Sequence, residues 1–166
     1  MTQLSLFHRL LEVNMFQIVE KNINNLSDLK LEILENPTVG GIVYFQGVVR
    51  NHNEGKDVKS LEYEAYTPMA NKTGQEIVNK AKEKFDIVDA YCIHRKGHLD
   101  INDTAVWVIT TSHHRKEAYE ASQYIIDTVK GEVPIWKKEH YVNEQAQWIA
   151  CHRCGEHHNH KDHKHD

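Results

Sequence analysis

Residues 104–131, TAVWVITTSHHRKEAYEASQYIIDTVKG, join the most apolar strand pattern of the chain to a helix pattern. Thr104–Thr111 is rich in β-branched residues, which favours a strand. Ser112 fits a helix N-cap and Gly131 fits a stop signal, so a helix is predicted over residues 113–130. Its inward side is formed by Ala118, Ala121, Ile125 and Val129.

Further strand and helix patterns lie on both sides of this unit. Strands are predicted at Gly40–Arg50, Ser60–Tyr66, Ile87–Arg95, Ile135–Tyr141 and 147–150, with a short one after Met15, and helices between Ser27 and Pro37 and over Pro68–Phe85. Gly97 is expected to close the strand before it, and residues 50–57 are expected to be a polar loop. Because hairpins mix with single helices, we predict an α+β fold with a largely antiparallel sheet.

Length and composition limit the classes of protein that fit. The chain has 166 residues, of which 40% are hydrophobic and 27% charged, a balance typical of one soluble domain. A net charge of −4 disfavours a general polyanion binder, so an anion site must be a local cluster of cations. No signal peptide or membrane span is recognisable, and a cytoplasmic protein is expected.

The two ends differ from the middle, and a domain is predicted over residues 15–150. Residues 1–14 are either an extension, which includes the case of a misassigned start, or a short N-terminal helix. Residues 151–166 have almost no apolar side chains and form a Cys/His-rich tail that we expect to be disordered. Its candidate metal ligands are Cys151, Cys154, His157 and His158. Adventitious Zn or Ni binding, a structural knuckle and an accident of composition remain open.

Basic residues that follow strands are the first candidates for chemistry. Arg50 comes directly after a predicted strand, and its planar guanidinium suits phosphate, although a solvated loop arginine remains the alternative. His113, His114 and Arg115 lie in the predicted first turn of a helix, where the dipole already favours an anion. Ordinary surface polarity is the alternative for these residues.

Three lysines form the other candidate group. The turn at residues 131–134 can bring Lys130 and Lys137 close together. Lys138 is adjacent to Lys137 on a strand and must point to the opposite face, so at most one of them shares a pocket with Lys130. Two crowded lysines disfavour each other's charge, which is one way to obtain a basic or nucleophilic amine. No nucleotide-binding loop or HExxH motif is present, and Cys92 lies within a predicted strand as a small buried residue.

Five ordered stretches resemble a known family, the large (catalytic) subunits of molybdopterin synthase, or MoaE family. They are FQGVVRNHNEG (45–55), LEYEAYTPMA (61–70), IHRKG (93–97), TSHHRKEAYEA (111–121) and VPIWKKE (133–139). The resemblance covers roughly residues 38–150. It implies an α/β hammerhead fold with a small antiparallel β subdomain.

The resemblance also implies an activity and partners. The family is a sulfurtransferase of molybdenum cofactor biosynthesis, in which two large subunits form a central homodimer within a heterotetramer. A small ubiquitin-like subunit presents a C-terminal Gly-Gly thiocarboxylate, and the substrate is cyclic pyranopterin monophosphate (precursor Z). No bound cofactor is required, and the sulfur nucleophile arrives on the partner.

Matching the motifs residue by residue implies a site. The resemblance implies that Lys130 and Lys137 are catalytic residues. It also implies that the substrate is bound by Val48, Val49, Arg50, His114, Arg115, Lys138 and Glu139. His152 lies near a position where relatives often carry arginine, and the tail departs from the family pattern.

Two other functional classes compete with this interpretation. A metal-delivery protein would depend on residues 151–166 and would lose its function when they are deleted. A nucleic-acid-binding module would use Arg50, Arg115, Lys137 and Lys138, and its affinity would fall steeply with salt. The negative net charge weighs against the second class.

Overall fold

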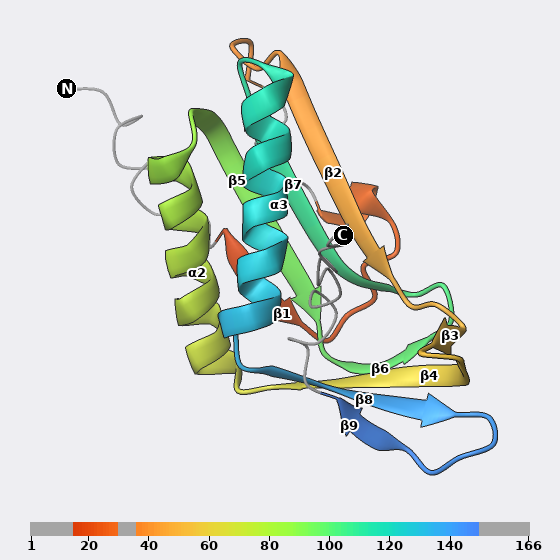
Figure 1. Ribbon diagram of the computed structural model, residues 1–166. Coiled ribbons are helices and arrows are strands. Elements are labelled where there is room, and N and C mark those ends of the chain that lie inside the picture. Colours follow the sequence, from red (N-terminus) through yellow and green to blue (C-terminus); the bar gives the residue numbers. More distant parts are fainter. Residues whose placement is uncertain (1–14, 30–35, 150–166) are drawn as a thin grey trace, which may run out of the picture.

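The computed structural model describes residues 15–29 and 36–149, and this part of the chain forms two β-sheets and two α-helices (Figure 1). The elements are β1 (Phe16–Val19), the 3-10 helix η1 (Leu26–Leu29), β2 (Gly41–Val48), β3 (His52–Asn53), β4 (Lys56–Ala65), α2 (Thr67–Lys84), β5 (Ile87–Arg95), β6 (Gly97–Asp100), β7 (Thr104–Ser112), α3 (Arg115–Glu132), β8 (Ile135–Tyr141) and β9 (Gln147–Ile149). The predicted α+β class is confirmed.

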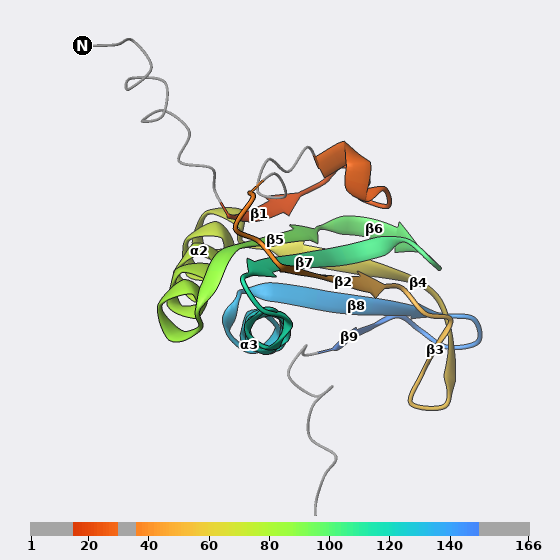
Figure 2. The ribbon, with the colours of Figure 1, turned by 90° about the horizontal axis from the view of Figure 1, so that it is seen from above.

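The first sheet has the strand order β1-β5-β7-β2, and both α-helices cover one of its faces (Figure 2). Only the β1–β5 pair is parallel among the described strand pairs, so the predicted largely antiparallel arrangement is confirmed. β7 is central and every one of its residues is buried, because helices cover one face and the segment around Ile23 covers the other.

The core follows the alternation of side chains along β5 and β7. Cys92 and Val108 point toward the helices and pack with α2 and α3, as expected for a small buried cysteine. Tyr91 and Trp107 point to the other face, where the Trp107 indole donates a 2.7 Å hydrogen bond to the carbonyl of Ile23. Burial raises the pKa of the Cys92 thiol, so this side chain is kept as a neutral apolar group.

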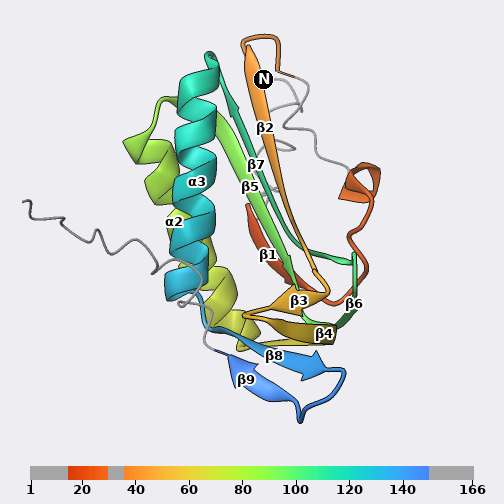
Figure 3. The same cartoon turned by 45° about the vertical axis from the view of Figure 1, so that its right-hand side comes forward.

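The second sheet lies beyond the C-terminal end of α3 (Figure 3). It has the order β3-β4-β8-β9, and β6 pairs with β4 on the side away from β8. Alternation along β8 turns Lys137 and Glu139 inward and Trp136 and Lys138 outward. The inner face of this sheet therefore carries charged side chains toward the end of the helix.

Several sequence predictions need correction at their boundaries. The expected polar loop 50–57 contains β3 and the start of β4, and Gly97 begins β6 instead of closing a strand. Both missed strands are four residues or shorter, too short to show an alternating pattern. Of the region where a helix was expected, between Ser27 and Pro37, the structure describes a 3-10 helix at Leu26–Leu29, and residues 30–35 lie outside the described part.

The helix predicted over residues 113–130 begins and ends two residues later than expected. Ser112 is the last residue of β7, its hydroxyl donates to the carbonyl of His114, and His114 occupies the N-cap. Gly131 lies inside the helix and does not stop it. The chain leaves the helix at Val133, because the ring of Pro134 disfavours helical backbone in the residue before it.

The proposed end segments, residues 1–14 and 151–166, lie outside the described residues. Within the described part, neither helix is long and apolar enough to cross a membrane.

Candidate active site

A cavity of about 280 Å³ opens where the end of β2, the last turn of α3 and the inner face of the second sheet meet. Two of its walls come from consecutive elements, α3 and β8, which the short segment around Pro134 joins. The lining residues are Val48, Arg50, His52, Asn53, Val58, Leu61, Tyr63, Lys130, Lys137 and Glu139.

The two predicted catalytic lysines do meet at this cavity. Lys130 lies in the last turn of α3, and Lys137 follows on the inner face of β8 after the chain has reversed. Lys137 is 9% exposed, and its ammonium lies 2.8 Å from the carboxylate of Glu139. A buried cation beside a carboxylate keeps one fixed position, since its alternatives would leave a charge unpaired.

Glu139 holds the centre of a hydrogen-bond cluster. It is only 2% exposed and accepts bonds from Lys137, from the Tyr141 hydroxyl at 2.8 Å and from the Asn53 amide, whose nitrogen lies 3.1 Å from both carboxylate oxygens. Burial raises the pKa of Glu139, but these donors and the charge of Lys137 outweigh it, so the pKa lies below its ordinary value. Burial, followed by the hydrogen bond to Glu139 and the charge of that carboxylate, raises the pKa of Tyr141 to about 12.

Arg50 adds a third cation to the cavity wall. It lies two residues beyond the end of β2 and donates a 2.7 Å hydrogen bond to the side-chain oxygen of Asn53. Arg50, Lys130 and Lys137 thus face Glu139, the one carboxylate among the lining residues. The excess of positive charge in a partly enclosed space favours binding of an anionic ligand.

His94 packs against Tyr63, one of the residues that line the cavity. Its ring packs edge-on against Tyr63, with the ring centroids 4.9 Å apart, and its Nδ1–H donates to the carbonyl of Arg95 at 2.9 Å. Burial lowers the pKa of His94 to about 4, the bond to Arg95 acts in the opposite direction, and the charge of Lys130 lowers it further. The imidazole is therefore neutral at physiological pH.

Two of the predicted pocket residues lie elsewhere. Lys138 points to the outer face of the second sheet, with its Nζ 5.3 Å from the centre of the Trp148 ring. Val49 is 1% exposed and packs in the core with Val58 and Leu61 instead of lining the cavity. Both corrections follow from strand alternation, since Lys137 and Val48 already take the positions that face the cavity.

His114 and Arg115 also lie away from the cavity of their own chain. They begin α3, whereas Lys130 is in its last turn, and at 1.5 Å per residue the two ends are about 22 Å apart. The Cα of Arg115 lies beside Gly41, at the start of β2, and Figure 1 shows this end of the helix far from the second sheet. The expectation that these residues share one cavity with the lysines within one chain is wrong.

The predicted site residues omit five of the lining residues, which are His52, Asn53, Val58, Leu61 and Tyr63. Asn53 had a usable signal, because Glu54-Gly55 is a turn pair that reverses the chain and returns Asn53 toward the second sheet. The candidate metal ligands of the tail, together with His152, lie outside the described residues. Within residues 15–29 and 36–149, no cluster of His, Cys, Asp and Glu is arranged to hold a metal ion.

Comparisons with known proteins show what this chain is similar to. The profile of the family described as MoaE protein matches residues 19–132. The chain is 42% identical over 132 residues to a Thermoplasma volcanium protein named molybdopterin synthase catalytic subunit, an alignment that covers 80% of this chain and 95% of that protein. A Bacillus subtilis protein of the same name is 42% identical over 135 residues, with 81% and 84% covered. Among solved structures, molybdopterin synthase from Staphylococcus aureus superposes with a TM-score of 0.72 at 37% identity and covers 81% of this chain and 96% of its own.

Proposed function

Because this chain belongs to the MoaE protein family, we propose that it is the large, catalytic subunit of a molybdopterin synthase in molybdenum cofactor biosynthesis. It would transfer sulfur from the thiocarboxylated C-terminus of a small ubiquitin-like subunit to cyclic pyranopterin monophosphate. In each of two transfers, the thiocarboxylate sulfur forms a bond to a carbon of the substrate, and that carbon loses its oxygen substituent, either as water or as the phosphate oxygen released when the ring opens. Water then cleaves the acyl–sulfur bond and leaves a carboxylate on the partner.

One observation supports this assignment most strongly: Arg50, Lys130 and Lys137, from three separate segments, line a single cavity. Both proposed guests are anions, since the substrate carries a cyclic phosphate and the donor ends in a thiocarboxylate. Fixed cations in a sheltered site stabilise such charges far better than water does. The partner supplies the sulfur, so the buried Cys92 need take no part.

The lysines would divide the chemistry between them. We assign Lys130 to the thiocarboxylate, which it would pair with and position. Lys137, held by Glu139, would act in proton transfer as the phosphate ring opens. Arg50 would bind the phosphate through its planar guanidinium. The reaction needs no bound cofactor, and a chain without residues 151–166 should keep its turnover whether or not the tail binds Zn or Ni.

The remaining predicted site residues, His114 and Arg115, would act from a second copy of the chain. β2 pairs only with β7 among the described strands, and its open edge carries the exposed apolar side chains of Ile42, Tyr44 and Val48. An exposed apolar edge strand is a ready template for pairing.

Antiparallel pairing of two β2 edges would explain how these residues reach the substrate. β2 runs from Gly41, beside Arg115, to Val48, which lines the cavity. Two such strands lying antiparallel would place Arg115 of one copy at the cavity of the other. The assembly would then be a homodimer of large subunits with a small subunit at each end.

Reconstitution tests the activity directly. The chain is mixed with a thiocarboxylated small subunit and cyclic pyranopterin monophosphate, and molybdopterin is measured. Lys130→Ala and Lys137→Ala should each abolish the product while binding of the small subunit persists. Lys138→Ala, on the outer face, and Lys72→Ala, on the exposed side of α2, should keep most of the turnover. Near-normal turnover in either of the first two variants contradicts the assignment.

Subunit mixing tests the shared site. A dimer with Lys130→Ala on one copy and Arg115→Ala on the other would contain one intact site and one doubly defective site. Co-expressed, differently tagged copies should therefore regain activity that neither parent variant has. If both residues act within one chain, the mixed dimer stays as inactive as its parents.

A further inference from the structure

Asn53 lies between two charged groups of the cavity and contacts both. Its side-chain oxygen accepts a 2.7 Å hydrogen bond from Arg50, and its side-chain nitrogen lies 3.1 Å from both oxygens of Glu139. The amide can adopt only this orientation, because a guanidinium only donates and an ionised carboxylate only accepts. We propose that Asn53 is a positioning residue that couples Arg50 to the Glu139–Lys137 pair.

The hairpin formed by β3 and β4 holds the side-chain amide of Asn53 in this position. Asn53 is the last residue of β3 and pairs with Lys56, so the turn consists of two residues, Glu54 and Gly55. Their φ angles are +49° and +78°, the combination that a tight two-residue hairpin turn requires. The backbone N–H of Val58 also donates to the carbonyl of Asn51 at 2.9 Å. A tight turn leaves little freedom at its ends, and the amide is therefore set before any ligand arrives.

The coupling links phosphate binding to proton transfer, the two parts of the proposed reaction. For this link, the inference rests on the proposed function. Arg50 would bind the substrate phosphate, while Lys137 would act where the phosphate ring opens. Through Asn53, the guanidinium is connected by hydrogen bonds to Glu139 and so to the Lys137 ammonium 2.8 Å away. A fixed spacing between the phosphate-binding group and the proton-transfer group is worth a large factor in rate, since small misplacements are costly.

Removal of the amide should therefore lower turnover without loss of the fold. Asn53→Ala is expected to reduce kcat/KM by about tenfold to a hundredfold, the range for hydrogen bonds to charged groups. Combined with Arg50→Ala, it should cost much less than the product of the two separate losses, because both changes break the same connection. Asn51→Ala is the matched control: Asn51 lies in the same segment, and its side chain contacts His52 at 3.0 Å.

Asn53→Asp tests the donor role at constant shape. The introduced carboxyl can still accept from Arg50, but when ionised it repels Glu139 and cannot donate to it. A carboxyl pair this close shares one proton as the pH falls, which restores the original pattern of donor and acceptor. The ratio of variant to wild-type kcat/KM should thus rise as the pH is lowered from 8 toward 5. The other charged and titratable groups around this position are the same in both proteins, so the ratio compares only the substituted side chain; they are Arg50, His52, Glu54, Lys56, Lys130, Lys137 and Tyr141.

Thermal unfolding across the same pH range gives a readout that does not depend on activity. The difference in Tm between wild type and Asn53→Asp should shrink at low pH. A flat activity ratio, an unchanged Tm difference, or strict additivity of Asn53→Ala with Arg50→Ala overturns the proposal. If wild type itself yields no molybdopterin, the proposed function fails, while the unfolding comparison still decides whether the amide joins the two charged groups.

Discussion

The ammonium of Lys137 and the carboxylate of Glu139 lie 2.8 Å apart on the same face of β8, and both side chains are almost fully buried. Two residues of separation on a strand place them side by side toward the cavity. Because neither group can turn to water, each depends on the other for compensation of its charge. Loss of one partner in such a pair is far more damaging than loss of both.

Glu139→Gln should therefore destabilise the protein by about 3 kcal/mol, because it leaves the Lys137 ammonium buried without a countercharge. The double variant Lys137→Met with Glu139→Gln should recover much of that loss, since no charge is then buried. Urea unfolding of the four proteins in this cycle measures the effect. Additive losses would show that the two charges do not depend on each other.

Most elements with a periodic pattern were predicted within one or two residues, except that β4 begins at Lys56, four residues before its predicted start at Ser60. α2 spans Thr67–Lys84 where apolar spacing predicted Pro68–Phe85, and β5 and β8 match their predicted bounds. β3 and β6 were missed, because strands of two and four residues have too few positions for alternation to show. α3 continues past Gly131, the predicted stop, because glycine only permits a helix to end, whereas Pro134 disfavours helical backbone at Val133.

The candidate site was predictable only where local structure determines it. Reversal at Pro134 brings Lys130 and Lys137 together, and strand alternation separates Lys137 from Lys138. The placement of His114 and Arg115 depends on the direction and length of α3, which put them at its opposite end. Contacts such as that of Asn53 with Glu139 join residues 86 positions apart, and no local pattern specifies them.

His94 should make the stability of the fold depend on pH. Its pKa is lowered from 6.5 to about 4, chiefly by burial, so the unfolded chain binds a proton between these values that the folded chain does not. The contribution of neutral His94 to the free energy of unfolding is fully present above pH 6.5. It is lost as the pH falls toward 4, by an amount on the order of 3 kcal/mol.

The comparison that isolates this effect uses His94→Gln, which stays neutral at every pH and keeps an N–H donor. The difference in unfolding free energy between wild type and this variant should narrow as the pH falls from 6.5 to 4, because only wild type must exclude a proton. His98→Gln is the control, since the side chain of His98 is 60% exposed. A constant difference across this range would mean that His94 is accessible to protons.

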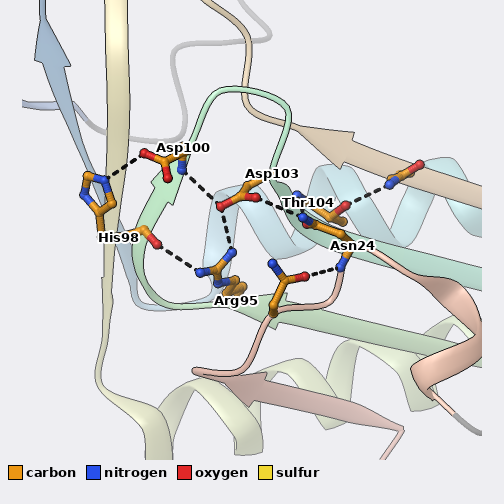
Figure 4. A network of polar contacts seen from close by, with 8 residues as sticks. Asn24, Arg95, His98, Asp100, Asp103 and Thr104 are labelled. Atoms are coloured by element: carbon orange, nitrogen blue, oxygen red, sulfur yellow. Dashed lines mark hydrogen bonds and ion pairs between the residues drawn. The ribbon is translucent and has the colours of Figure 1, made fainter.

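Asp103 ties three segments together at the turn between β6 and β7 (Figure 4). It accepts hydrogen bonds from Asn24 at 2.9 Å, from Arg95 at 3.0 Å and from the backbone N–H of Asp100 at 3.1 Å. The bond from Asn24 is the main cause that lowers the pKa of Asp103 below 3.8, with Arg95 and Asp100 adding to it against the effect of burial.

Asp103→Asn should therefore cost about 1–3 kcal/mol at pH 7, because an amide cannot accept from all of these donors and carries no charge for Arg95. A lowered carboxyl pKa contributes stability above pH 3.8, and that stability is lost as the pH falls through the folded-state value. The difference in unfolding free energy between Asp103→Asn and wild type should thus disappear in strong acid. Asp100→Asn, whose side chain is 79% exposed, should change stability by no more than about 0.5 kcal/mol.

Two helical glycines should respond in opposite directions to the same substitution. Glycine inside a helix is normally less favourable than alanine by about 0.5–1 kcal/mol. A Cβ on Gly131 in α3 would meet no atom within 4 Å, so Gly131→Ala should raise the unfolding free energy by about that amount. A Cβ on Gly74 in α2 would overlap the ring of the buried Phe16, and Gly74→Ala should lower stability by about 1–3 kcal/mol despite the better helix propensity. Phe16→Leu frees space at that contact, so Gly74→Ala should cost less in that background than in wild type. Urea denaturation of these variants measures both signs, and a stabilising Gly74→Ala would show that α2 does not approach β1 this closely.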